Sequence, residues 1–212
     1  TYNPMDYYME ALRREPGDVR CNNAVGLLLM RKGQFAMAES YFRKAVETLT
    51  ERNPNPYDGE PIYNLGLALK YQGRYNEAYD RFYKACWNAA WQDAGYFACA
   101  QISTMQNRLA DALDEINHSL IRNWHNHKAR ALKVAVLRRM GQSEEALQLI
   151  EDSLAIDKFN FGCRYEKYLI TNVSDELATL KEMMRGEPHN YDEIALDYCA
   201  AGCWQEAASL WN

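Results

Sequence analysis

Glycine, alanine and aromatic residues recur at fixed steps along this chain, in stretches whose apolar positions have helical spacing. The segment 63–85 shows the whole pattern, which consists of Gly66, Gly73, Tyr75, Ala78, Phe82 and Ala85. Related patterns surround positions 26, 100 and 134. Positions 66, 100 and 134 are 34 residues apart, and the step from 26 to 66 is 40 because a proline-rich loop adds six residues. A fixed period of this length is typical of stacked helical repeats.

Each repeat predicts two helices joined by a tight turn. Gly73 lies where the end of a helix favours a left-handed residue. Gly66 and Ala78 are expected where the two helices cross closely, which offsets the cost of a mid-helix glycine, about 1 kcal/mol relative to alanine. Phe82 is expected to fill the space between one helix pair and the next, and Ala85 to let the next first helix settle against it.

The pattern predicts a single array of helix pairs over residues 1–212, which begins in mid-repeat. Two units near the end depart from it, because one loses the mid-helix glycine and the other is partial. The expected segments are an isolated second helix at 3–16, repeat 1 at 19–50, a proline-rich loop at 51–61, repeat 2 at 59–92, repeat 3 at 93–126, repeat 4 at 127–158, a degenerate repeat 5 at 160–187 and a partial repeat 6 at 188–212.

The chain resembles the tetratricopeptide repeat family. The resemblance is carried by the period of 34, the Leu65-Gly66 pair, the turn glycine, the aromatic residue two positions later and the alanine–aromatic–alanine ladder. It implies an all-α fold, a right-handed α-α superhelix (solenoid) of five to six helix hairpins. The chain also has a weaker resemblance to the repeat region of large bacterial proteins in which a β-rich, mutarotase-like domain precedes the repeats. This resemblance is based on the cysteine, tryptophan and tyrosine residues among the helical positions.

Composition and charge narrow the classes of function. A net charge of −5 disfavours nucleic acid as a partner, since nucleic-acid binders usually present a basic surface. No run approaches the roughly 18 apolar residues that a membrane span needs, so no membrane partner is expected. Six cysteines at mostly apolar helical positions favour free thiols and a cytoplasmic location. The chain opens without methionine, so we expect it to be a segment of a longer protein.

The sequence carries no catalytic motif, so no catalytic residue, no cofactor and no metal are expected. Phosphate-binding, dinucleotide-binding, zinc-protease and serine-hydrolase signatures are absent from the sequence. His118, His125 and His127 are expected to be exposed, and Cys199 and Cys203 to flank a helix end within packing distance. The acidic residues Asp111, Asp114, Glu115, Glu144 and Glu145 are expected to be solvated near helix starts. Aromatic residues in repeat slots, Trp204 and Trp211 among them, are expected in the core.

A third stripe of each first helix faces neither its partner helix nor the next pair. The family resemblance places this stripe on the concave side of the array, where such proteins bind partners. The candidate partner-binding residues are Asn23, Leu27, Met30, Tyr63, Asn64, Leu67, Lys70, Tyr71, Phe97, Gln101 and Lys128. Large aromatic side chains often dominate such an interface.

The function predicted from these observations is a non-catalytic scaffold. Its groove would bind a peptide, a partner protein or another domain of the same chain. An ordinary mixed surface, or a groove filled by a segment of the chain itself, is the competing interpretation. An accessory region of a larger carbohydrate-active enzyme is the alternative function, and an RNA-binding helical repeat is a third that fits the charge poorly.

Overall fold

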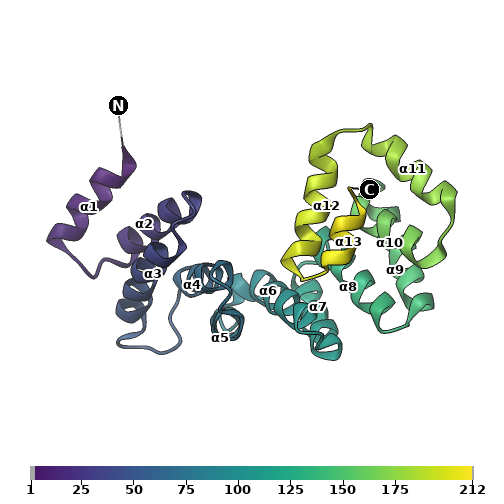
Figure 1. Ribbon diagram of the computed structural model, residues 1–212. Helices are drawn as coiled ribbons and strands as arrows, with labels where there is room; N and C mark the ends of the chain where they lie inside the picture. Colours follow the sequence, from purple (N-terminus) through teal and green to yellow (C-terminus); the bar gives the residue numbers. More distant parts are fainter. Residues whose placement is uncertain (1–2, 212) are drawn as a thin grey trace. The chain divides into compact units, whose positions relative to one another are not determined.

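The computed structural model describes residues 3–211, and Thr1, Tyr2 and Asn212 lie outside the described residues. This part of the chain is entirely helical, with no strand (Figure 1). The expected all-α class is therefore confirmed. The structure divides into two compact units, one up to Gly95 and one from Tyr96, and each is described separately.

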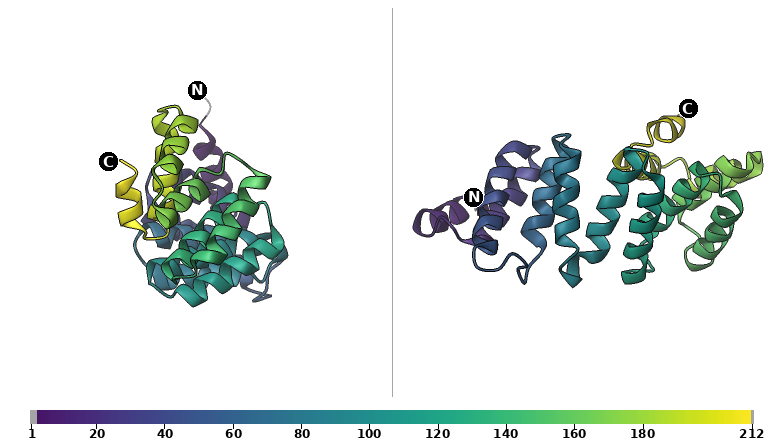
Figure 2. Two further views of the ribbon diagram at one scale, coloured as in Figure 1. Left: turned by 90° about the vertical axis from the view of Figure 1, so that its right-hand side faces the viewer. Right: turned by 90° about the horizontal axis from the view of Figure 1, so that it is seen from below.

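Unit 1 contains five helices, a short 3-10 helix and the start of a sixth helix. The helices are α1 (Pro4–Arg14), α2 (Val19–Arg31), α3 (Phe35–Thr50), α4 (Glu60–Tyr71), α5 (Tyr75–Ala85), η1 (Ala89–Trp91) and the beginning of α6 (Gln92–Met105). Asp18 caps α2 by accepting a hydrogen bond from the backbone N–H of Cys21, and a proline stands in the first turn of α1 and of α4. The hairpins α2–α3 and α4–α5 lie side by side (Figure 2).

Unit 2 continues α6 and adds the remaining helices. They are α7 (Leu109–Arg122), α8 (His127–Arg139), α9 (Ser143–Ile156), α10 (Phe161–Thr171), α11 (Ser174–Met184), α12 (Pro188–Ala200) and α13 (Trp204–Ser209). Its main core joins helices that are distant in sequence, since Ala100, Ile116 and Leu132 belong to the same buried cluster as Tyr198. The last helix pair thus packs back onto the earlier ones.

The turn residues adopt the left-handed conformation that the repeat predicts. Gly73 has φ of 77°, and the next residue, Arg74, donates its backbone N–H to the carbonyl of Leu69 at 3.0 Å, which closes the end of α4. The equivalent position of repeat 3 is Asn107, whose φ is 59°. Asparagine tolerates this region better than most residues do, so the turn persists without glycine.

The mid-helix glycine makes room for an aromatic ring. A Cβ atom built on Gly66 would lie 2.7 Å from Cε1 of Phe82, and one on Gly26 would lie 2.4 Å from Cε1 of Phe42. Both rings are fully buried. The close approach of the paired helices is confirmed. The ring of Phe82 fills its own hairpin, which differs from the expected position between one hairpin and the next.

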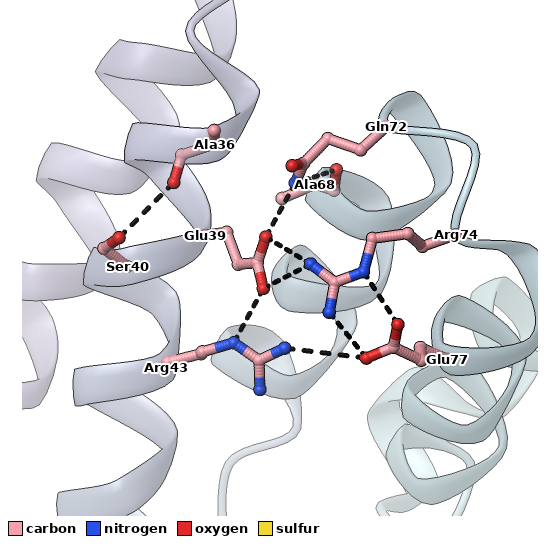
Figure 3. Close-up of polar contacts among 8 residues, drawn as sticks. All are labelled: Ala36, Glu39, Ser40, Arg43, Ala68, Gln72, Arg74 and Glu77. Atoms are coloured by element: carbon pink, nitrogen blue, oxygen red, sulfur yellow. Dashed lines mark hydrogen bonds and ion pairs between the residues drawn. The ribbon is translucent and has the colours of Figure 1, made fainter.

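A buried carboxylate joins the two hairpins of unit 1 (Figure 3). Glu39 of α3 accepts hydrogen bonds from Arg43 at 2.7 Å, from Gln72 at 2.8 Å and from Arg74 at 2.8 Å, and Arg74 also pairs with Glu77. Burial raises the pKa of Glu39, but these hydrogen bonds and the charge of Arg43 outweigh it and leave the pKa below its ordinary value. The carboxylate therefore stays ionised where the hairpins meet.

The sequence-based expectation about burial is wrong for Trp204, Trp211 and Glu115. Trp204 and Trp211 are 58% and 57% exposed, because the short helix α13 turns Ala207 into the core and leaves both indoles outside it. Glu115 is only 6% exposed, although Asp111 and Asp114 of the same helix are in solvent. Glu115 lies on the buried side of α7 next to Ile116, so its place on the helix decides its exposure.

Candidate recognition surfaces

The candidate residues of unit 1 belong to α2 and α4, the first helices of its two hairpins. Most of these side chains are half-buried, whereas Asn64 is buried and Tyr71 is 62% exposed. We call this set the α2–α4 face, and its members are Asn23, Leu27, Met30, Tyr63, Asn64, Leu67, Lys70 and Tyr71. The face mixes aliphatic and aromatic surface with a few polar groups.

The asparagines of the α2–α4 face are bonded to each other. Asn64 donates its side-chain amide to the carbonyl oxygen of Asn23 at 2.9 Å, and Asn23 donates to Oε1 of Glu60 at 3.1 Å. This chain of hydrogen bonds links α2 to α4. The two amides expected to meet a partner therefore act first as a bridge between hairpins.

The two tyrosines of the face differ in their surroundings. The ring of Tyr63 packs against Phe82 and Trp91, with centroids 5.2 Å and 4.9 Å away. The ring of Tyr71 stacks on Phe35 with a centroid separation of 4.9 Å and keeps most of its surface in solvent. Tyr71 is thus a preformed aromatic contact, because the stacking already restricts its rotamer.

Burial lowers the pKa of Lys70 from 10.5 to about 8. Between these two values the unfolded chain holds more protons on Lys70 than the folded chain does, so this residue's contribution to stability rises with pH. Below pH 8 the buried ammonium opposes folding in full.

Replacing Lys70 by methionine is expected to stabilise the protein at pH 7 by about 1–3 kcal/mol, because methionine fills the same space without a charge to desolvate. The pH dependence of stability between pH 8 and 10 should also flatten. Urea unfolding of the wild type and Lys70→Met at pH 7 and pH 10 measures both effects. Lys32→Met, at an exposed position, is the control. Equal midpoints for Lys70→Met and wild type at pH 7 would contradict the expectation.

The other candidate residues, Phe97, Gln101 and Lys128, line a cavity of about 190 Å³ within unit 2. Phe97 and Gln101 come from α6, and Lys128, Ala131 and Ala135 come from α8. The opposite wall is provided by Ile194, Asp197 and Tyr198 of α12. Helical spacing predicts that the α6 and α8 residues belong to the stripes of their helices, but it does not indicate that α12 covers them.

Ionic contacts fasten α12 and α13 along α8. Lys128 pairs with Asp197 at 2.7 Å, and Arg138 pairs with Glu206 at 2.8 Å. Arg138 also binds Glu166 of α10, whose exposed fraction is 0%, with its Nε atom 2.6 Å from Oε2. The Tyr198 hydroxyl donates to the other oxygen of Glu166 at 2.6 Å.

The histidines differ in their surroundings. His125 is exposed, and His118 stacks on Tyr96 with centroids 4.9 Å apart. The expectation of an exposed imidazole is wrong for His127. This residue begins α8, is half-buried and lines the cavity. Within residues 3–211 no three potential metal ligands come together.

The cysteines are all free thiols, and four of them are buried. Cys203 is buried and Cys199 half-buried, beside the turn between α12 and α13. Burial raises the pKa of Cys163 to about 12 and also raises the pKa of Cys203, so both thiols are protonated and weakly reactive.

Comparisons with known proteins support the resemblance seen in the sequence. Residues 19–48 match the family model of the tetratricopeptide repeat. Among solved structures, the pilF protein of Pseudomonas aeruginosa matches with a TM-score of 0.68 and 19% identity over 90% of this chain and 86% of that one. YrrB, described as a tetratricopeptide repeat protein with an unusual peptide-binding site, matches with a TM-score of 0.63 and 17% identity over 92% and 95%.

MamA has the same fold, with a TM-score of 0.65 and 17% identity over 73% of this chain and 86% of that one. At these sequence identities, the structural similarity establishes the fold.

Within the described part of the chain, no helix is long and apolar enough to cross a membrane.

Proposed function

We propose that this chain, which carries the tetratricopeptide repeat and its fold, is a non-catalytic scaffold that binds a peptide or a partner protein. In this proposal, another domain of the same chain would bind to the same surface as a partner protein. The binding surface in this proposal includes the α2–α4 face. The observation that carries the proposal is the exposed, stacked ring of Tyr71, which lies one turn from the half-buried Leu67 on α4, together with the half-buried Leu27 and Met30 on α2.

Several features support a protein as the partner. An aromatic anchor of restricted mobility next to aliphatic side chains gives contact area at a small cost in side-chain entropy. The net charge of −5 makes a nucleic acid an unfavourable partner. YrrB is described by its peptide-binding site, and its fold resembles this one. Six free thiols suit a reducing compartment such as the cytoplasm.

Selection of peptides from a random display library on the immobilised full chain tests the proposal. We expect clones whose affinity falls at least tenfold in the variant Leu67→Ala/Tyr71→Ala, because this variant removes the aliphatic and aromatic contacts. Tyr57→Ala is the matched control, since Tyr57 is an aromatic residue in the 51–59 loop that is 82% exposed. Clones that bind both variants equally, or a selection that enriches none, would overturn the α2–α4 face as the binding surface.

A further inference from the structure

The α12–α13 hairpin lies on the same stripe of α8 that the repeat pattern predicts for a partner. Lys128 and Arg138, three turns apart on α8, are each paired with an acidic residue of the hairpin. Between them Ala131 and Ala135 face Ile194 and Tyr198 across the cavity. The contact extends to α6, because a Cβ atom built on Gly202 would lie 2.6–2.9 Å from Met105. We call this surface of α6, α8 and α10 the hairpin seat.

The hairpin fits its seat incompletely. A pocket of about 190 Å³, partly open to solvent, remains between Phe97 and Ala131 on one side and Ile194 on the other. An apolar side chain that fills such a pocket removes apolar surface from water. A helix with a larger side chain at the position of Ile194 would therefore make more contact with the seat than α12 does.

One of the two ionic contacts holds the hairpin weakly. Burial raises the pKa of Asp197 above its ordinary value even though Lys128 acts in the opposite direction. Both side chains of this pair are also exposed, Lys128 by 57% and Asp197 by 41%, and exposed ion pairs contribute little to stability. Glu206 differs, since the hydrogen bond from Arg138 overcomes the effect of burial and lowers its pKa. The ionic contact of α12 is accordingly weaker than that of α13, whose side chains are less exposed, and α12 is otherwise held by the buried Tyr198.

We propose that the α12–α13 hairpin is an internal, displaceable ligand of unit 2, and that the hairpin seat recognises an amphipathic helix of a partner protein. Such a helix would present a large apolar residue, then an acidic residue three positions later and an aromatic one next to it, as Ile194, Asp197 and Tyr198 do. The acidic residue complements Lys128. The inference rests on the proposed scaffold function, and it names the partner class for unit 2.

Exchange of the charge pair tests this proposal in the full chain. The variants Asp197→Lys and Lys128→Glu each place like charges between the hairpin and α8, and both should open the seat. Two labelled peptides with the sequence of residues 188–211 serve as probes, one wild type and one with Asp197→Lys. We expect the wild-type peptide to bind the Asp197→Lys protein, and the altered peptide to bind the Lys128→Glu protein, each at least tenfold more tightly than the crossed pairs.

The wild-type protein should bind either peptide more weakly, because its own hairpin competes at a high effective concentration. A wild-type peptide that carries Ile194→Phe should bind the Asp197→Lys protein more tightly than the unaltered peptide, because the larger ring fills the cavity. Fluorescence anisotropy measures all these affinities, and circular dichroism checks that each protein variant is folded. Hydrogen exchange of the wild type adds a test without substitution, in which amides of α12 should exchange at least tenfold faster than those of α8.

The proposal would be overturned if the matched and crossed pairs of peptide and protein had equal affinities. It would also be overturned if the amides of α12 exchanged as slowly as those of α8. A dimer that forms only when the two protein variants are mixed would reassign the seat to a second copy of this chain. These experiments leave the α2–α4 face unchanged. If they fail while the selected clones still depend on Tyr71, the partner assigned to the hairpin seat is wrong and the scaffold function stands.

Discussion

Replacing Phe82 by alanine is expected to destabilise the protein by about 3–5 kcal/mol, because it empties a fully buried site next to a glycine that has no side chain to collapse into it. The ring of Phe82 also packs against Tyr63. Loss of the ring therefore loosens the α4–α5 hairpin and one side of the α2–α4 face together. Urea unfolding followed by circular dichroism measures the change.

Three further substitutions make the Phe82 prediction specific. Tyr83→Ala, at an aromatic residue of the same helix that is 47% exposed, should change stability by less than about 1 kcal/mol. Gly66→Ala should destabilise the wild type, because its new methyl group would meet the ring of Phe82. In a Phe82→Leu background, the same methyl group should lower the free energy of unfolding by less than it does in the wild type. An unchanged unfolding midpoint in Phe82→Ala would mean that the ring is not the packing element of the hairpin.

Local features of the fold could be predicted from the sequence because each depends on residues within one repeat. The left-handed turn at Gly73 follows from a glycine seven positions after Gly66, and both helices follow from periodicity. Asn107 shows the limit of a rule based on glycine alone. The turn of repeat 3 is conserved in geometry although its residue type differs, because asparagine also tolerates positive φ.

The candidate site could be predicted only in part. The stripe rule found Lys128, Phe97 and Gln101, which do share one surface of unit 2. It could not find Asp197 or Glu206, because they lie about 70 residues further along the chain and reach α8 only when the last hairpin folds back. Helical periodicity shows which face of α12 is apolar, but it does not show which earlier helix that face meets.

Burial of charged residues was also beyond the sequence pattern. Arg130 is fully buried, with its guanidinium 4.2 Å from the ring of Trp124 and its Nε atom bonded to Ser153 at 2.9 Å. Its position in repeat 4 corresponds to that of Ile62 in repeat 2. A rule that assigns arginine to the surface therefore fails here, although Nη2 of Arg130 has no hydrogen-bond partner in the described part of the chain.

Glu166 is a second buried charged residue, and its substitution is expected to cause a large loss of stability. Its carboxylate is completely buried, and it accepts hydrogen bonds from Arg138 and from the Tyr198 hydroxyl. Glu166→Ala is expected to cost about 3–5 kcal/mol, because it leaves Arg138 with only Glu206 and the tyrosine hydroxyl without an acceptor. Urea unfolding gives the change, and Glu151→Ala, which removes a 62% exposed partner of Lys167, should cost less than about 1 kcal/mol.

Glu166→Ala leaves charged and polar groups unpaired and also removes side-chain volume. Replacing the charged groups together separates these two causes of its lower stability. Arg138→Met/Glu166→Leu/Glu206→Gln replaces both buried groups by apolar side chains and neutralises Glu206, the other partner of Arg138, so no charge loses its partner. The triple variant should recover most of the stability lost in Glu166→Ala, since apolar replacement of a whole buried ion pair is often neutral or stabilising. If it is as unstable as Glu166→Ala, lost volume at α10 is not the cause, because leucine fills the site, and the buried ion pair itself stabilises the protein. If it recovers stability, the ion pair mainly selects the position of the α12–α13 hairpin.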